Sequence, residues 1–392
     1  MISVKEAKEK IEEKVGLLQP KVLPLQKICG LTLAENVYAK FDIPSFAQSS
    51  MDGYAIKFED KDVPLSAQNK IAAGDSDSHS LSSNHAARIF TGAPLPANAD
   101  TVVMQEKVVV EDGKILIKDD NLKQGDYVRN KGAEIKCGEI ALKAEMLVTP
   151  ATIGFLAAIG LAEVAVYPSP AVTIIITGNE LQQPGKKLLF GQVYEANSYS
   201  LSAAVKSLGI EEIQILYAED KLEIVESVLQ KALKESDLIL LTGGVSVGDY
   251  DFVFEAAENC GIEKHFHKIK QKPGKPLFFG MKDSKVVFGL PGNPASVLTC
   301  FYEYVLPAIE KMSAKKNLLK KIKATLQNDY SKNAGMTHFL RGFFENGSVE
   351  ILRSQASFQL RSFAIANCLI VIKEEEESVK AGDEVEVHLL PL

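Results

Sequence analysis

Three loops rich in glycine and polar residues each follow a run of apolar residues that predicts a buried strand. The stretch "GNELQQPG" follows "AVTIIIT", "TGGVSVGDYD" follows "DLILL", and "PGNPAS" follows "KVVFGL". In open parallel sheets, ligands bind beyond the carboxyl ends of the strands, which is where these loops begin. Glycine lets the backbone approach a bulky ligand, and the starts of the following helices favour phosphate. The sequence therefore predicts a phosphate-ligand site made by these loops.

Carboxylates in two of these loops indicate a cation. Glu180 lies in the first loop, and Asp249 and Asp251 lie in the second. Carboxylates repel phosphate unless a cation separates them, and Mg²⁺ is held by one or two carboxylates together with substrate oxygens. The alternative is that glycine and aspartate are ordinary turn formers, which is the better interpretation of a single such loop. Three such loops in one domain favour the ligand site.

A basic segment, "KHFHKIKQKPGKP", lies between the second and third loops. Lys270, Lys272 and Lys275 surround its Pro-Gly turn. Lysine ammonium groups are compact point charges that suit oxyanions, so the segment is either an oxyanion clamp or an exposed hairpin. His265 and His267 alternate on a strand with no third ligand at metal-like spacing, and we interpret them as structural.

The order of elements predicts the architecture that positions these residues. Strands and helices alternate over residues 170–317, which predicts a central, doubly wound parallel α/β domain. Residues 44–138 are rich in short strands, with a hairpin signal at Asp112-Gly113, and predict a β-rich domain that acts as a lid. Residues 318–392 return to strands around Asn346-Gly347 and predict a small β-barrel.

Helix start signals complete this outline. Ser3 and Glu6 form a capping-box pattern, so residues 1–16 predict a short helix that packs on the α/β domain. Asn197 is the predicted cap of another helix. We expect residues 17–43, which are punctuated by proline, to form a linking domain together with residues 139–169.

Composition excludes several classes of protein. The 392 residues are 46% hydrophobic and carry a net charge of −7, so no nucleic-acid footprint is indicated and an oxyanion would need a local basic pocket. The five cysteines are odd in number and far apart, which favours a reducing compartment, the cytoplasm. The apolar stretch 146–168 contains Thr149 before Pro150, a helix start, and predicts a helix and a strand rather than a membrane span.

Six motifs taken together resemble those of the molybdopterin molybdenumtransferase family, which includes MoeA and the E domain of gephyrin. They are "SSMDGYAI", "TGAPLPANADTVVMQE", "TGNEL", "TGGVSVGDYDF", "KPGKP" and "LPGNPAS". The resemblance implies insertion of molybdenum into adenylylated molybdopterin, with molybdate and Mg²⁺ consumed or bound and AMP released. It also implies an elongated homodimer with four domains per subunit, in which the β-rich domain of one subunit closes the site of the other.

The resemblance also implies roles for individual residues. Acidic or hydroxyl positions important in the family match Asp52, Thr91, Glu134, Glu180 and Asp251. The loop around the nucleotide-linked pyrophosphate matches Gly243, Gly244 and Ser246, and the motif "LPGNPAS" adds Pro291, Gly292 and Asn293. Positions that gather an oxyanion such as molybdate match Lys272, Lys275, Ser296, Arg341 and Ser362. On spacing alone, Asp52 and Thr91 would be ordinary turn residues.

The chain departs from the family pattern at three positions. Asn179 stands where aspartate is frequent, which removes a charge from any metal contact there. Ala356 replaces a frequent glycine and Arg361 a frequent serine, so Ser357 competes with Ser362 as the oxyanion contact. Molybdate and tungstate have nearly the same shape and charge, and the sequence does not distinguish them.

The implied partners are small-molecule substrates and other proteins of the same pathway, not nucleic acid or membrane. We expect a separate adenylyltransferase to deliver the activated pterin and apo-molybdoenzymes to receive the product. Two alternatives stay open at this point. The α/β domain alone also resembles pterin adenylyltransferases and related hydrolases, and gephyrin's related domain serves as a binding scaffold.

Overall fold

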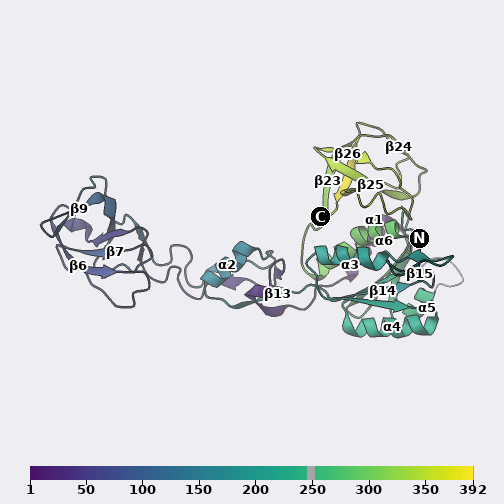
Figure 1. The fold of residues 1–392 in the computed structure, drawn as a ribbon, viewed down its shortest axis with the longest axis horizontal. Coiled ribbons are helices and arrows are strands. Elements are labelled where there is room, and N and C mark those ends of the chain that lie inside the picture. The colour runs from purple at the N-terminus through teal and green to yellow at the C-terminus, as the bar shows by residue number, and fades with distance from the viewer. Residues whose placement is uncertain (245–251, 392) are drawn as a thin grey trace.

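The computed structural model describes residues 1–244 and 252–391 and shows an elongated molecule (Figure 1). A β region lies at one end, and a narrower linking region joins it to an α/β region and a barrel region at the other end. Each region is named for the sheet or sheets described below. Both chain termini lie at the end formed by the α/β and barrel regions. Within the described residues, no helix is long and apolar enough to cross a membrane.

The α/β region is built on a six-stranded sheet with the order β17-β14-β18-β22-β21-β19. Its strands are β14 (Val172–Thr177), β17 (Ile213–Ala218), β18 (Leu238–Thr242), β19 (Glu263–Lys268), β21 (Pro276–Lys282) and β22 (Lys285–Leu290). The first four strands of that order are parallel, whereas β21 pairs antiparallel with both β22 and β19. The α/β prediction is confirmed, but the sheet is mixed. A tight hairpin joins β21 to β22, and such a turn can only connect antiparallel strands.

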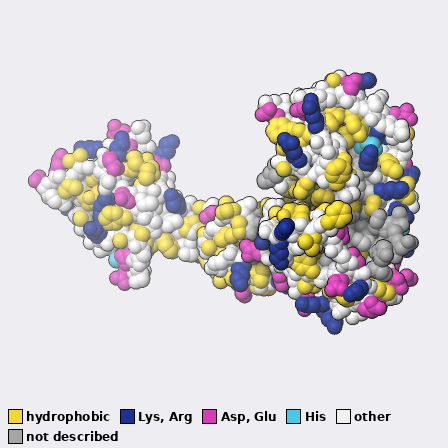
Figure 2. All heavy atoms as spheres, turned by 45° about the vertical axis from the view of Figure 1, so that its right-hand side comes forward, with side chains coloured by type: hydrophobic (Ala, Val, Ile, Leu, Met, Phe, Trp, Pro, Cys, Tyr) yellow, Lys and Arg dark blue, Asp and Glu magenta, His cyan; other side chains and the backbone are white. Residues whose placement is uncertain are grey.

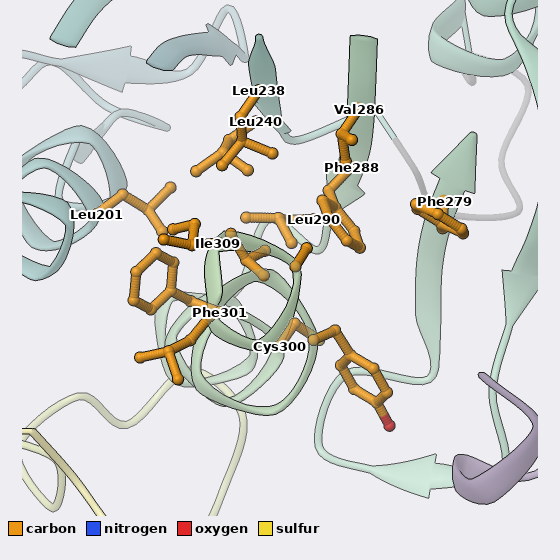
Figure 3. Close-up of a cluster of buried hydrophobic side chains, with 14 of the residues drawn as sticks. Leu201, Leu238, Leu240, Phe279, Val286, Phe288, Leu290, Cys300, Phe301 and Ile309 are labelled. Carbon is orange, nitrogen blue, oxygen red and sulfur yellow. The ribbon is translucent and has the colours of Figure 1, made fainter. Parts of the chain in front are cut away.

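Helices cover both faces of this sheet. They are α3 (Asn197–Ser207), α4 (Leu222–Glu235), α5 (Phe252–Asn259), α6 (Pro294–Cys300), the π-helical turn η4 (Phe301–Val305) and α7 (Leu306–Met312). Leu240 and Phe288 pack against Leu201 and Phe301 on one face (Figure 3), while alternate residues such as Leu241 pack beneath α4 and α5 on the other. Burial on both faces explains why the strands are continuous apolar runs.

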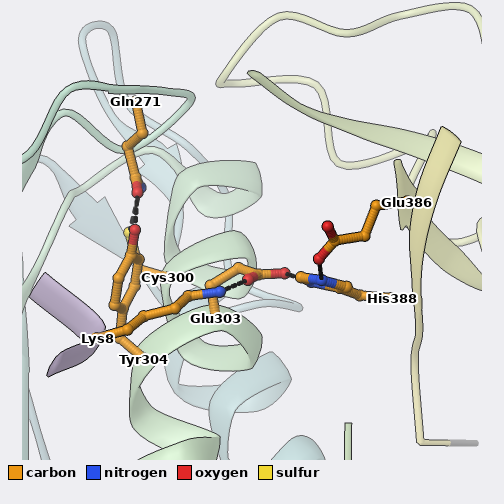
Figure 4. Close-up of polar contacts among 7 residues, drawn as sticks. All are labelled: Lys8, Gln271, Cys300, Glu303, Tyr304, Glu386 and His388. Carbon is orange, nitrogen blue, oxygen red and sulfur yellow. Dashed lines mark hydrogen bonds and ion pairs between the residues drawn. The ribbon is translucent and has the colours of Figure 1, made fainter. Parts of the chain in front are cut away.

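The N-terminal helix α1 (Val4–Lys14) joins this core. Its predicted capping box is confirmed, because the Ser3 hydroxyl accepts from the Glu6 backbone N–H at 3.1 Å and the Glu6 carboxylate accepts from the Ser3 N–H at 2.7 Å. Ala7 and Ile11 belong to the same hydrophobic core as α3 and α7. An interdomain cluster of Lys8, Glu303, His388 and Glu386 then connects α1 to the α/β and barrel regions (Figure 4). Glu303 and His388 are buried, and Lys8 and Glu386 are half-buried.

The β region contains a six-stranded sheet with the order β8-β5-β7-β6-β10-β9 and a smaller sheet, β11-β4. Its elements are β4 (Gln48–Ser49), β5 (Gly53–Ile56), η2 (Phe58–Asp60), β6 (Leu65–Ile71), β7 (His85–Ile89), β8 (Thr101–Met104), η3 (Gln105–Lys107), β9 (Val108–Glu111), β10 (Lys114–Ile117) and β11 (Val128–Arg129). The predicted hairpin is confirmed: Asp112 and Gly113 have φ of 49° and 74°, as a type I′ turn requires.

The linking region combines two separate stretches of the chain. Its elements are β1 (Lys21–Pro24), η1 (Leu25–Lys27), β2 (Thr32–Leu33), β3 (Val37–Tyr38), β12 (Ile140–Leu142), α2 (Pro150–Ala158) and β13 (Glu163–Tyr167). The sheet order β1-β13-β2 joins the two stretches. The predicted helix and strand in 146–168 are confirmed, and the Thr149 hydroxyl caps α2 by accepting from the Thr152 N–H at 3.2 Å.

The barrel region is closed, as predicted. Its strands are β23 (Lys320–Leu326), β24 (Tyr330–Ser331), β25 (Thr337–Glu345), β26 (Ser348–Ile351), β27 (Cys368–Ile372), β28 (Ser378–Val379) and β29 (Glu384–Leu389). The order β25-β26-β23-β29-β27 closes because β27 also pairs with β25. The short strand β20 (Gln271–Lys272) of the basic segment pairs with β25 and ties this segment to the barrel.

One predicted helix cap is wrong. The cap position of α3 is Ala196, and Asn197 is already the first helical residue. The Glu195 carboxylate accepts from the Ser198 N–H at 2.7 Å and satisfies the helix end. The Asn197 side chain is therefore released from capping, and its amide Nδ2 donates to the Gly292 carbonyl at 2.9 Å.

Candidate functional site

A cavity of about 590 Å³, which we call the strand-end cavity, lies at the carboxyl ends of β14, β18 and β22. All three loops singled out in the sequence contribute to its lining, through Glu180, Gly243, Gly244, Pro291, Gly292 and Asn293. The start of α3 and the short strands β15 (Leu181–Gln182) and β16 (Val193–Tyr194) line the rest. The parallel strands therefore bring the three loops to one edge of the sheet.

The two glycines after β18 are required by close packing at this edge. Gly243 and Gly244 have φ of 86° and 60°, a region that side chains disfavour. A Cβ on Gly243 would lie 2.5 Å from the Thr177 carbonyl oxygen, and one on Gly244 would lie 2.9 Å from Val253. A side chain at either position would push the β18 loop out of its place against β14.

A carboxylate is folded over the end of β14. Both Glu180 carboxylate oxygens lie 3.0 Å from the point where a Cβ on Gly178 would stand, so a side chain at position 178 would displace this carboxylate. A second acidic residue, Asp220, follows β17 and accepts from the Asn179 backbone N–H at 3.1 Å. The side chain at position 179 is thus not needed for this contact. Glu180 offers hard oxygen ligands of the kind that Mg²⁺ prefers.

Three residues predicted for the second loop lie outside the described residues. They are Ser246, Asp249 and Asp251. The described part of the metal-ligand prediction is Glu180 alone.

A second cavity, of about 670 Å³, lies between the α/β and barrel regions, and we call it the basic cavity. Lys272, Lys275 and Ser296 line it from the α/β region, and Ser357 and His338 line it from the barrel. It shares four lining residues with the strand-end cavity and so adjoins it: Pro276, Pro291, Asn293 and Phe358. A ligand can therefore extend from one cavity into the other.

The turn that carries the two lysines is held by a buried glutamine. The Nε2 of the Gln271 amide donates to the carbonyls of Pro273 and Gly274, at 3.0 and 3.1 Å. The Tyr304 hydroxyl donates to the opposite end of the same amide, as Figure 4 shows. Gly274 has φ of 87°, and a Cβ there would lie 2.6 Å from the Cys300 sulfur. The two exposed lysines thus flank a turn whose own residues, Pro273 and Gly274, are buried.

Arg341 is fully buried in the barrel beneath the loop that lines the basic cavity. Its Nε donates to the Ser362 hydroxyl at 3.1 Å, and its Nη2 donates to the carbonyls of Ser354 and Ala356, at 2.8 and 3.2 Å. Its Nη1 is buried and has no hydrogen-bond partner among the residues that the structure describes. Burial lowers the pKa of Arg341 to about 10, so the side chain remains a cation at neutral pH.

The two competing serines have different surroundings. Ser357 lines the basic cavity, and its hydroxyl accepts from the Asn293 amide at 3.0 Å. Ser362 is 2% exposed, and its hydroxyl accepts from Arg341 while donating to the Ser354 carbonyl at 2.9 Å. The geometry thus sets Ser357 at the cavity wall and Ser362 behind it as a support for Arg341.

His338 is a further residue of the basic cavity that the sequence analysis misses. Its Nδ1 lies 2.7 Å from the Tyr330 hydroxyl. Burial, with smaller contributions from Lys332 and Lys272, lowers the pKa of His338 to about 4. The imidazole is therefore neutral near pH 7, and the positive charge of this cavity comes from the lysines.

Asp52, Thr91 and Glu134 lie far from both cavities along the same chain. Asp52 accepts from the backbone N–H and the hydroxyl of Thr91, both at 2.8 Å, and the backbone hydrogen bond in particular lowers the pKa of Asp52. This pair belongs to the β region near β7, at the opposite end of Figure 1 from β15. Glu134 is exposed and donates its backbone N–H to the Ile43 carbonyl at 2.9 Å. One chain alone does not bring these residues to the cavities.

Asp220 and Gln271 are also absent from the sequence-based prediction of the site. Asp220 follows the strand β17 by two residues, so the strand-end rule applied to "IQILYAED" would have found it. Gln271 carries no such signal, because its partner Tyr304 lies 33 residues away along the chain.

Comparison with known proteins gives a consistent result over the whole chain. Three family models match: the MoeA N-terminal region (domain I and II) over residues 2–160, a probable molybdopterin binding domain over 173–311, and the MoeA C-terminal region (domain IV) over 323–390. A molybdopterin molybdenumtransferase of Haemophilus influenzae is 34% identical, with 100% of both chains covered. One from Nostoc sp. is also 34% identical, over 93% of this chain and 87% of the relative.

A solved structure has the same fold. The crystal structure of a molybdopterin biosynthesis MoeA protein from Pyrococcus horikoshii superposes with a TM-score of 0.86 at 31% identity, and 99% of each chain is covered.

Proposed function

Because the chain belongs to the MoeA family of molybdopterin molybdenumtransferases, we propose that it inserts molybdenum into adenylylated molybdopterin, with molybdate and Mg²⁺, and releases AMP. Molybdenum insertion into molybdopterin is the enzymatic activity of this family. The adenylylated substrate, the oxyanion and the metal ion are the finer parts of the proposal. The observation that supports them is the pair of adjoining cavities. One is lined by lysines and serines, and the other by glycines and Glu180 at the ends of the parallel strands.

The basic cavity suits molybdate. Molybdate is a tetrahedral dianion that only accepts hydrogen bonds, and the lining supplies Lys272, Lys275 and the hydroxyls of Ser296 and Ser357. The Arg341 guanidinium contacts the loop that contains Ala356 and Ser357 through its Nη2, and its Nη1, which has no partner among the described residues, is a further buried donor. A small movement of that loop would give the oxyanion an arginine contact as well.

The strand-end cavity suits the pterin nucleotide. The glycines after β18 allow close approach of a pyrophosphate to the backbone, and the cavity opens toward the basic cavity where the oxyanion would lie. The substrate thus spans both cavities, with its phosphates near their shared wall. Positioning and charge neutralisation by fixed groups then supply most of the rate, and no covalent nucleophile is needed.

Glu180 fits a role as a Mg²⁺ ligand. Its carboxylate lies over Gly178 at the edge of the strand-end cavity, and Asp249 and Asp251 are the further ligands of the proposal. When bound, Mg²⁺ would neutralise the pyrophosphate and stabilise AMP as a leaving group. The carboxylates of Glu180, Asp249 and Asp251 would hold the ion beside the phosphates of the substrate.

A homodimer would complete the site. Asp52 and Thr91 lie at the far end of the elongated chain, so a second copy can bring them to the cavities whereas the same chain cannot. Exposed apolar side chains around the strand-end cavity are available for this contact, including Leu189, Phe190 and Tyr194 in and beside the β15–β16 loop. Figure 2 shows hydrophobic side chains gathered where the α/β and barrel regions meet. A separate adenylyltransferase and apo-molybdoenzymes would act before and after this enzyme, in the cytoplasm.

The experiment supplies adenylylated molybdopterin and Mg²⁺ and titrates molybdate against tungstate while AMP and the metal-containing cofactor are measured. AMP release coupled to metal insertion is the expected result, and the lower half-saturating concentration identifies the preferred oxyanion. AMP release that is indifferent to both oxyanions would indicate a hydrolase, and no turnover would indicate a binding scaffold. The variant Glu180→Gln should need more Mg²⁺ for the same rate.

A further inference from the structure

The strand-end cavity contains a buried hydrogen-bond acceptor that has no partner among the described residues. Asn197 lines this cavity and is only 8% exposed. Its Nδ2 donates to the Gly292 carbonyl at 2.9 Å, whereas its Oδ1 has no partner among the described residues. A buried polar atom without a partner costs about 1–3 kcal/mol, so native structures rarely keep one without a reason.

The orientation of this amide is set by its surroundings. The Gly292 carbonyl can only accept, so the Asn197 NH₂ group must face it and Oδ1 must face the other way. Glu195, the neighbouring carboxylate of the same wall, is already engaged, because both of its oxygens accept from Ser198. Asn197 is therefore a neutral acceptor that this wall offers to a ligand.

A neutral acceptor selects a particular part of the substrate. Phosphates near neutral pH and molybdate present acceptors only, so neither can satisfy Oδ1. A pterin nucleotide carries three kinds of neutral donor: the N–H groups of its aminopyrimidinone edge, the hydroxyls of its ribose and the amino group of its adenine. The basic cavity next to it attracts the anionic groups through Lys272 and Lys275. The two cavities therefore orient the substrate, because one binds its neutral hydrogen-bond donors and the other binds its anionic groups.

We propose that Asn197 is a substrate-binding residue that determines specificity, with Oδ1 accepting a hydrogen bond from an N–H or O–H donor of the bound pterin nucleotide. The inference rests on the proposed function, since it deepens the account of the same site. It explains why Asn197 does not cap α3 although it stands at the helix start. The cap is provided by Glu195, which leaves the asparagine amide free to face the cavity.

The test measures binding by calorimetry to the full-length protein and to Asn197→Leu, which has a similar volume and no acceptor. The probes are AMP, 2′,3′-dideoxy-AMP and 6-hydroxymethylpterin. If Oδ1 binds a ribose hydroxyl, the wild-type protein prefers AMP over the dideoxy analogue by about tenfold, and the variant loses this preference. If Oδ1 binds the pterin edge, the variant binds 6-hydroxymethylpterin about tenfold more weakly and both nucleotides as the wild type does. If Oδ1 binds the adenine amino group, the variant binds both nucleotides about tenfold more weakly and 6-hydroxymethylpterin as the wild type does.

A purely structural role predicts a different pattern. It would lower the unfolding temperature of Asn197→Leu and weaken all three probes equally, which would overturn the proposal. We expect an unfolding temperature no lower than that of the wild type, because the variant removes a buried unpaired acceptor and leaves only the exposed Gly292 carbonyl to water. Asn197→Ala repeats the measurement without the added bulk of leucine.

The matched control is Asn259→Leu, on the opposite face of the sheet, where the asparagine amide donates to Glu226. This variant should bind all probes as the wild type does. Unchanged binding of every probe by Asn197→Leu, in a protein whose wild type binds and turns over substrate, overturns the inference alone. A wild-type protein that binds no probe and shows no turnover contradicts the proposed function and this inference with it.

Discussion

The interdomain cluster and the two-cavity site both bury polar groups, but only the cluster is complete. In the interdomain cluster, Glu303 is 0% exposed and its two oxygens are engaged by Lys8 at 2.5 Å and His388 at 2.7 Å. The other nitrogen of His388 lies 2.8 Å from Glu386, so each group has a partner of opposite charge (Figure 4).

The two-cavity site, by contrast, leaves Asn197 Oδ1 and Arg341 Nη1 without partners among the described residues. Both atoms are buried away from water, so the missing hydrogen bonds cost free energy of folding. A complete network holds domains together, and one broken member leaves an uncompensated charge. An incomplete network is destabilising until a ligand supplies the missing partners. We therefore expect variants of the cluster to affect stability and variants of the cavities to affect function.

Glu303→Gln should have the largest effect on stability. The substitution keeps the shape of the side chain but leaves the buried imidazolium of His388 and the ammonium of Lys8 with less negative charge. Breaking a buried ion pair by removing one partner costs about 3–5 kcal/mol of the free energy of unfolding. Chemical denaturation of the variant measures this loss, while the specific activity of the folded fraction should stay close to that of the wild type.

Glu12→Gln is the control for Glu303→Gln. Glu12 pairs with Lys311 at 2.7 Å between α1 and α7, but its side chain is 68% exposed. Surface ion pairs contribute less than about 1 kcal/mol. Equal losses in the two variants would contradict the distinction between a buried complete network and a surface pair.

The double variant Lys272→Met, Lys275→Met should do the opposite of Glu303→Gln. Removing two cations from the basic cavity should lower the affinity for molybdate by about a hundredfold or more, since hydrogen bonds to charged groups contribute about 1.5–3 kcal/mol each. Both lysines are exposed, so the free energy of unfolding should change little. The half-saturating molybdate concentration reports the effect, with Lys234→Met in α4 as control. A large loss of stability with unchanged molybdate dependence would contradict the assignment of this cavity.

The strand-end loops could be predicted from sequence, whereas the partners that complete each cluster could not. Apolar runs followed by glycine and carboxylate are local signals, and they correctly located Glu180 and Gly243 at one edge of the sheet. Asn197 was wrongly predicted as a helix cap because the helix begins one residue earlier, where the Ala196 carbonyl accepts from the Ser200 N–H and the Glu195 carboxylate accepts from the Ser198 N–H. The strand β21 was missed because its antiparallel pairing depends on residues across the sheet rather than on its own pattern.

The interdomain cluster was missed for the same physical reason. Lys8, Glu303 and His388 are separated by hundreds of residues or by a domain boundary, and no spacing rule connects them. Likewise, nothing in the sequence near Arg341 indicates that one of its nitrogens would lack a partner. The buried polar atoms without hydrogen-bond partners, which indicate a ligand, can be recognised only when the side chains are placed in three dimensions.

The pH dependence of stability should report the complete cluster. Burial opposes the charged form of His388, but Glu303 and Glu386 outweigh it and raise the pKa of His388 above its ordinary 6.5. Burial likewise opposes ionisation of Glu303, but Lys8 and His388 lower its pKa from 4.5 to about 2. The stability from His388 is thus fully present below pH 6.5 and is lost as pH rises through its raised pKa. The stability from Glu303 is present above pH 4.5 and is lost toward pH 2.

The combined contribution of the cluster is therefore largest between about pH 4.5 and 6.5. Denaturation of the wild type at pH 6 and pH 9 should show a decrease in the free energy of unfolding. The variant His388→Gln should be less stable at pH 6 and should show a smaller decrease between these two values. An equal decrease in both proteins would assign the pH dependence to groups outside the cluster.

The smallest effects are expected for Ser357→Ala and Ser362→Ala, of which the first should change molybdate affinity and the second stability. Ser357 faces the basic cavity, so Ser357→Ala should weaken molybdate by up to about tenfold through the loss of one hydrogen bond and leave stability unchanged. Ser362 supports the buried Arg341, so Ser362→Ala should lower the free energy of unfolding by about 1–3 kcal/mol because Nε loses its acceptor. Each variant is the other's control when molybdate dependence and denaturation are measured on both. If Ser362→Ala weakens molybdate more than Ser357→Ala does at equal stability, Ser362 reaches the oxyanion and the loop that contains Ser357 must move on binding.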